Sequence, residues 1–183
     1  TIVSTATGEA VGAFAAGSAH VFTGSGASFT HTAQLSSDTP QTGEFMGSAA
    51  DIHGDTIVIG SLGREGYRGA AYIYTRTSSG WSLQTMLSAK NAAADDFFGD
   101  RAVLGLDLVA ISRRRDDSGG RGVREAHDDT SPKVTDSGEV ILFVRRGSKW
   151  SELAHIKAAH PGVGENFGSA LAIRCQNAPR CCS

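Results

Sequence analysis

One short segment of this sequence occurs three times, and the spacing of its copies restricts the folds open to the chain. Residues 17–22 (GSAHVF) return as residues 69–74 (GAAYIY) and again as residues 138–143 (GEVILF), at intervals of 52 and 69 residues. The same two intervals separate the aromatic residues Phe29, Trp81 and Trp150, and the glycines Gly47, Gly99 and Gly168. Because independent landmarks keep one register, the sequence predicts three copies of one structural unit.

Each copy has the pattern of four short β-strands joined by turns. In the second copy the expected strands are residues 70–75, 81–87, 99–104 and 108–112, with a polar hairpin turn at 76–80. Glycine supplies 23 of the 183 residues, an excess typical of chains with many tight turns. A four-stranded unit that recurs about every 50 residues is typical of β-propeller blades.

The predicted fold is therefore all-β, a β-propeller-type array of about three four-stranded blades that forms an incomplete ring. Residues 1–16 are expected to be the last strand of a preceding blade plus a linker, followed by units at 17–68, 69–137 and 138–174. The third unit is incomplete, with three strands, which brings the expected total to twelve. Exposed edge strands predict that the isolated chain is poorly soluble or oligomeric unless further blades or another chain cover them.

Two segments depart from the repeat. The longer second interval predicts an inserted loop at 113–137. Residues 175–183 hold all three cysteines and do not continue the pattern, so we expect this tail to be a truncation or reading-frame artefact. Because the cysteines lie together at one end, they predict no disulfide framework across the fold.

Two runs of the second unit resemble a known family. They are residues 69–76 with 81–87 (GAAYIYTR and WSLQTML), and residues 95–99 with 106–111 (DDFFG and LDLVAI). Both are similar to the FG-GAP repeats of integrin α-chain propellers and of bacterial and algal surface proteins. The resemblance covers residues 17–174 and implies a propeller that serves as a binding or adhesion module outside the cell or at its surface. The DxDxDG-like calcium loop of integrin blades is absent from all three units.

Charge and hydropathy exclude two classes of partner. The formal net charge is −2, which gives no basic footprint for nucleic acid. The longest apolar stretches fall well short of the roughly 20 residues that a membrane helix needs. No signal peptide opens the chain, so we expect any secretion signal or membrane anchor to lie outside it.

The inserted loop holds the candidate binding residues. Carboxylates suit the hard Ca²⁺ ion, which makes calcium the candidate cofactor, and a rim insertion is where a propeller meets a protein or glycan. The candidate calcium ligands are Asp116, Asp117, Asp128 and Asp129, and the candidate partner contacts are Arg113, Arg114, Arg115 and Arg121. The alternative interpretation is a solvated loop whose opposite charges neutralise each other.

The repeated aromatic residues Phe29, Trp81 and Trp150 are expected to pack in the core or between blades, with sugar stacking by either tryptophan as the alternative. No nucleophile motif, HExxH or phosphate-binding glycine pattern is present, so no catalytic residue is predicted. His155 is expected to be a strand histidine and not a metal ligand with His160. The predicted function is a non-catalytic extracellular binding module; the alternatives are a propeller domain of a polysaccharide-processing enzyme and a structural fragment without activity.

Overall fold

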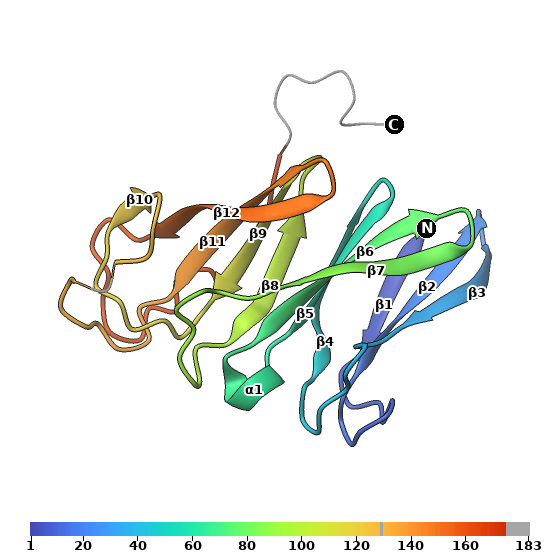
Figure 1. Cartoon of the computed structure of the whole chain (residues 1–183), viewed down its shortest axis with the longest axis horizontal. Coiled ribbons are helices and arrows are strands. Elements are labelled where there is room, and N and C mark those ends of the chain that lie inside the picture. The colour runs from blue at the N-terminus through green and yellow to red at the C-terminus, as the bar shows by residue number, and fades with distance from the viewer. Residues whose placement is uncertain (129, 175–183) are drawn as a thin grey trace.

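The computed structural model describes residues 1–128 and 130–174, and the cysteine-containing tail lies outside this part (Figure 1). The described chain is all-β, as predicted, with one short helix, α1 (Arg64–Tyr67). The strands are β1 (Ile2–Ala6), β2 (Ser18–Ser25), β3 (Ser28–Leu35), β4 (Met46–His53), β5 (Thr56–Ser61), β6 (Ala70–Thr77), β7 (Gly80–Leu87), β8 (Phe98–Leu104), β9 (Leu108–Arg113), β10 (Gly122–Arg124), β11 (Glu139–Arg146) and β12 (Lys149–Lys157).

The strands form three separate antiparallel sheets, none of them closed into a barrel. The first sheet has the order β1-β2-β3, the second β4-β5-β6-β7, and the third β10-β12-β11-β9-β8. The four strands expected in the second repeat copy are β6 to β9, each within two residues of its predicted bounds. They do not share a sheet, however: the first and second repeat copies each place their first two strands in one sheet and their last two in the next.

The sheets follow one another in chain order, side by side, and enclose two apolar layers (Figure 1). Alternating side chains of neighbouring sheets face each other in these layers, since successive residues of a strand point to opposite faces. The layer between the first two sheets contains Val21, Leu35, Met46, Ile57, Ile59 and Tyr72. The layer between the second and third contains Val58, Ile73, Phe98, Val109, Ile111 and Phe143.

Three backbone hydrogen bonds occupy equivalent positions of the repeat and connect each copy to the residues before it. The N–H groups of Phe45, Phe97 and Asn166 donate to the carbonyls of Ala15, Tyr67 and Asp136, at 3.1, 2.9 and 2.9 Å. Donors and acceptors both follow the intervals of 52 and 69 residues, and all six residues have positive φ angles. We call these three contacts the junction clips. Because they recur in register, the repeat is a feature of the backbone as well as of the sequence.

The clips also locate the insertion. Gly63 donates to Glu44 as Arg115 donates to Asp96, so the shorter interval holds as far as Arg115. The longer interval resumes at Thr135, whose carbonyl accepts from Gly164. The additional residues therefore lie between Arg115 and Thr135, inside the predicted 113–137 loop. They are not all loop, because β10 forms there and pairs with β12 through Val123 and Ile156.

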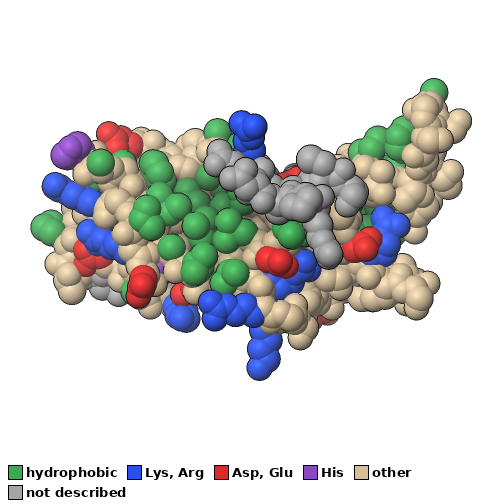
Figure 2. Space-filling view, turned by 90° about the horizontal axis from the view of Figure 1, so that it is seen from above, with side chains coloured by type: hydrophobic (Ala, Val, Ile, Leu, Met, Phe, Trp, Pro, Cys, Tyr) green, Lys and Arg blue, Asp and Glu red, His purple; other side chains and the backbone are tan. Residues whose placement is uncertain are grey.

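The third repeat copy differs from the prediction in its last part. A strand is expected after Gly168, but within residues 1–128 and 130–174 the last strand is β12, which ends at Lys157. The described residues still form twelve strands, because the unexpected strand β10 makes up for the expected strand that does not form after Gly168. In the view of Figure 2, hydrophobic side chains gather on the side of the molecule that carries the third sheet. Among the described residues, no helix is long and apolar enough to span a bilayer.

Candidate functional site

A polar concave site lies where the insertion meets the loop between β7 and β8. It is a pocket of ≈ 410 Å³ lined by Asn91, by residues 93–96 and by insertion residues between 113 and 136. A smaller pocket of ≈ 160 Å³ lies beside it, and Arg113 and His127 line both. The insertion therefore creates a polar hollow at one edge of the third sheet.

A buried arginine organises the floor of this site. The Arg113 guanidinium lies 2.6 Å from Asp96 Oδ2, 3.2 Å from Asp116 Oδ1 and 3.5 Å from Glu139 Oε2, and its side chain is only 3% exposed. Lys157 is buried as well and forms an ion pair with Asp116. These charges are stable inside the protein because each faces an opposite charge at hydrogen-bond distance.

Burial and the neighbouring opposite charges have opposing effects on the pKa values of Arg113 and Asp96. Burial alone would lower the pKa of Arg113, but Asp116 and Asp96 raise it above its ordinary value, so the guanidinium stays charged. Burial raises the pKa of Asp96, and the charge of Arg113 opposes this effect without cancelling it. The Arg113 cluster is thus a buried group of acidic and basic side chains around a charged guanidinium.

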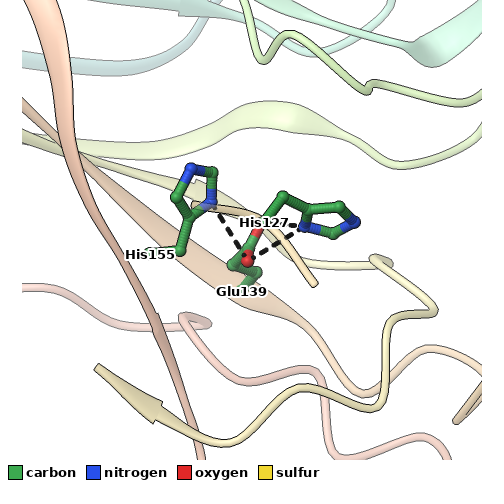
Figure 3. Close-up of side chains that lie close together, drawn as sticks. All are labelled: His127, Glu139 and His155. Atoms are coloured by element: carbon green, nitrogen blue, oxygen red, sulfur yellow. Dashed lines mark hydrogen bonds and ion pairs between the residues drawn. The ribbon is translucent and has the colours of Figure 1, made fainter. Parts of the chain in front are cut away.

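Glu139 forms a second group with two histidines behind Arg113 (Figure 3). Its Oε1 atom lies 3.2 Å from Nδ1 of His127 and 3.2 Å from Nδ1 of His155. His127 comes from the insertion, Glu139 begins β11, and His155 lies on β12. Burial would raise the pKa of Glu139, but the two histidines lower it to about 2. The hydrogen bond with Glu139 raises the pKa of His127.

The rim of the large pocket carries partly exposed charges. Arg115 donates to Asp136 at 3.0 Å, and its guanidinium lies 5.0 Å from the centre of the Phe97 ring. Arg114 also lies over Phe97 and forms an ion pair with Asp100. Arg115 is half-buried and Lys133 is exposed, so both are open to a ligand at the pocket mouth.

The structure separates the four arginines that were predicted to meet a partner. Arg113 is buried, which corrects that prediction, because the three carboxylates around it leave no side for a partner. Arg114 and Arg115 lie at the surface in intermediate positions, and Arg121 is exposed. Only these three remain candidates for a partner contact.

The predicted calcium ligands do not come together as a set. Asp116 is buried against Arg113 and Lys157, and Asp117 accepts from the backbone N–H of Asp136. Asp128 pairs with Arg124 and accepts from Thr130 and Ser131, contacts that lower its pKa. Asp129 lies outside the described residues.

The repeated aromatic positions lie at the margins of the apolar layers. Trp81 and Trp150 are half-buried, each with an arginine over its ring, Arg76 at 4.9 Å and Arg145 at 5.5 Å. Trp150 also donates from Nε1 to Gln84 at 3.1 Å, which joins the third sheet to the second. Phe29 is 42% exposed on β3, so at this position inter-sheet packing is not observed.

A similar pair of buried charges lies between the first and second sheets, which indicates that the Asp96–Arg113 pair belongs to the repeat and not to the insertion. Glu44 occupies the repeat position of Asp96, is fully buried, and pairs with Arg64 at 2.9 Å. Arg64 also donates to the Tyr72 hydroxyl at 2.7 Å. A buried acid with a buried arginine is therefore a structural feature of both junctions. His127, Glu139 and His155 have no counterpart in the other copies, where serine or alanine replaces Glu139, and glutamine or methionine replaces His155.

The sequence reasoning missed this histidine and glutamate group. One feature of the sequence could have indicated this group. Each repeat copy begins with a glycine, and the residue after it is Ser18 or Ala70 in the first two copies but the charged Glu139 in the third. The chain matches no known protein-family model, and no curated protein is similar enough in sequence to serve as a relative.

Proposed function

We propose that the chain is a non-catalytic binding or adhesion module of FG-GAP, integrin α-like propeller type that acts outside the cell or at its surface. It recognises a protein or glycan through the loop at 113–137. The observation that carries the proposal is the pocket of ≈ 410 Å³ that the insertion builds, with charged side chains at its mouth. Three consecutive antiparallel sheets with shared apolar layers support the propeller-type arrangement.

The state of the acids favours binding over catalysis. A general acid must exchange a proton with its substrate during turnover, and a carboxylate engaged by an arginine is not free to approach a substrate. In the pocket Asp96 pairs with Arg113, Asp128 with Arg124, and Asp136 with Arg115. These pairings leave the pocket charged and rich in hydrogen-bonding groups, which suits recognition of a polar ligand.

The proposal is tested by binding of the labelled chain to arrays of glycans and extracellular-matrix proteins, with and without Ca²⁺. We expect at least one ligand, and about tenfold weaker binding, or about 1.4 kcal/mol, when Arg115→Ala and Lys133→Ala are combined. Arg146→Ala is the matched control, because it removes an exposed charge from the hairpin at the far end of β11.

Each other outcome identifies one of the alternatives. Binding that the double variant leaves unchanged would overturn the assignment to the insertion. Indifference to every ligand would leave a structural fragment without activity of its own. Release of reducing ends from a polysaccharide would identify a propeller domain of a polysaccharide-processing enzyme.

A further inference from the structure

We propose that His127, Glu139 and His155 form a binding site for a divalent transition metal ion of zinc type, which fastens the insertion to the third sheet. In the part of the chain that the structure describes, they are the only group of three or more His, Cys, Asp or Glu side chains whose ligand atoms lie close enough to share an ion. Those atoms all lie within 4.8 Å of one another. The site lies behind the pocket mouth, and of its three residues His127 also lines the pocket of ≈ 410 Å³.

The distances agree with tetrahedral coordination. Zinc ligands at about 2.0–2.1 Å from the ion in a tetrahedron lie about 3.3–3.4 Å from one another. Glu139 Oε1 lies 3.2 Å from Nδ1 of each histidine, so two of the three ligand edges already have this length. Figure 3 shows both imidazole rings directed at the Glu139 carboxylate. The third edge, between the two histidine nitrogens, would have to shorten to the same length when an ion binds.

One ligand atom is buried without a hydrogen bond. The His155 side chain is 7% exposed, and its Nδ1 has no partner that meets hydrogen-bond geometry, although Glu139 Oε1 lies 3.2 Å away. A buried polar atom in this state is costly, and native proteins rarely leave one without a function. A metal ion bound at Nδ1 would satisfy it.

Each histidine also turns its other ring nitrogen toward a second carboxylate. Nε2 of His127 lies 3.8 Å from Asp116 Oδ1, and Nε2 of His155 lies 4.0 Å from Glu152 Oε2. Metal-bound histidines usually have a carboxylate or carbonyl at the nitrogen that does not bind the metal, which fixes the ring and raises its basicity. Here both carboxylates lie beyond hydrogen-bond distance but close enough to the rings for a small shift to bring them into contact.

The charge of the surroundings allows a dication despite the nearby Arg113. That guanidinium lies 3.5 Å from Glu139 Oε2, but Asp96 and Asp116 also contact it. Across the cluster, three buried carboxylates, Asp96, Asp116 and Glu139, face only two basic side chains, Arg113 and Lys157. A buried, uncompensated carboxylate attracts a positive ion.

The ligand types select the metal. Two imidazoles and one carboxylate suit zinc, whereas Ca²⁺ prefers six to eight oxygen atoms. The smaller pocket, lined by His127, His155 and Glu152, provides a route from solvent to the ligands. Because His127 belongs to the insertion and the other two ligands to β11 and β12, the bound ion would add to the contact that β10 of the insertion already makes with β12.

The test is equilibrium dialysis of the full chain against Zn²⁺ after removal of metals, with its three cysteines alkylated because free thiols also bind zinc. We expect one Zn²⁺ per chain, and a tetrahedral absorption spectrum when Co²⁺ replaces it. His155→Gln and His127→Gln should each abolish stoichiometric binding. His31→Gln is the matched control, since His31 also contacts a second histidine, His20, at 3.2 Å but lies at the surface.

Trypsin provides a second readout, because Arg121 and Lys133 are exposed cleavage sites within the insertion. Zinc should slow cleavage there in the parent chain and in His31→Gln, and should have no effect in the two site variants. If His155→Gln loses its native circular dichroism, His127→Gln decides the question, because that residue lies in the insertion. The proposal is overturned if the folded, alkylated parent binds no zinc, or if folded His127→Gln binds it as the parent does.

Discussion

Gly99 and Ala70 meet backbone to backbone, so closely that a Cβ atom on residue 99 would lie 2.2 Å from the Ala70 carbonyl oxygen. Gly99 also has a φ angle of +87°, which residues with a side chain rarely adopt. Gly99→Ala must therefore separate the second and third sheets as well as strain the backbone. We expect a loss of about 2–4 kcal/mol in the free energy of unfolding, measured by urea denaturation.

Gly26→Ala separates the two causes of that loss. Gly26 has a φ angle of +58°, but a Cβ atom there would meet nothing within 4 Å. Its cost should be the backbone strain alone, about 1 kcal/mol. Equal losses in both variants would show that the close approach to Ala70 does not matter.

Arg113→Met should be among the most destabilising substitutions in the third sheet. It leaves Asp96 and Glu139 as buried carboxylates without this counter-charge, which costs about 3–5 kcal/mol. Arg115→Met removes the adjacent arginine, whose pair with Asp136 is partly exposed, and should cost less than about 1 kcal/mol. Thermal and urea denaturation of both variants measures the difference, and a similar small loss in each would contradict the buried network.

Alkaline pH should destabilise the protein through two tyrosines. Burial raises the pKa of Tyr72, as does its bond to Glu44, and burial followed by the charge of Asp38 raises the pKa of Tyr74. Since the folded state keeps these protons longer than the unfolded state, stability is complete below the unfolded tyrosine value, about 10, and falls as pH rises through it.

Urea midpoints measured across that range should decrease with pH, together with the appearance of tyrosinate absorbance on unfolding. Tyr74→Phe removes one of the two groups, so its midpoint should decrease less steeply. A parallel decrease in parent and variant would assign the alkaline effect to other groups.

Self-association should depend on the outer face of the third sheet. Ile141 and Phe143 point into the apolar layer, so Leu142 and Val144 between and beside them point the other way, where both are half-buried. Leu142→Lys with Val144→Lys should shift the chain from oligomer to monomer in size exclusion with light scattering. Val123→Lys, at a 70% exposed position in the insertion, is the control. A parent chain that is already a stable monomer would refute the prediction of association.

The strands and the repeat were predictable because both are local. Alternating apolar residues and glycine-containing turns define β6 and β7 without reference to the rest of the chain. The assignment of strands to sheets could not be predicted in the same way, since it depends on which strands of neighbouring repeat copies pair with each other. The prediction placed four consecutive strands in one unit, whereas hydrogen bonds connect β5 to β6 across the unit boundary.

The candidate site was only partly predictable, because burial of a charge depends on residues far away in sequence. The run of charges after Arg113 has the composition of a solvated loop, and its partly exposed members, such as Arg115, agree with that interpretation. Asp116 is buried because Lys157 approaches it from β12, 41 residues later. Similarly, Glu139 meets His155 only because β11 and β12 pair in one register.

The junction clips affect how the sequence of such a chain can evolve. Each clip uses main-chain atoms, so its formation does not depend on which side chains occupy the segment between two clips. The additional residues between Arg115 and Thr135 lie in such a segment, and the clip from Asn166 to Asp136 forms after them as it does in the other copies. New loops, and new binding properties with them, are thus open to selection at these positions while the spacing of the framework stays the same.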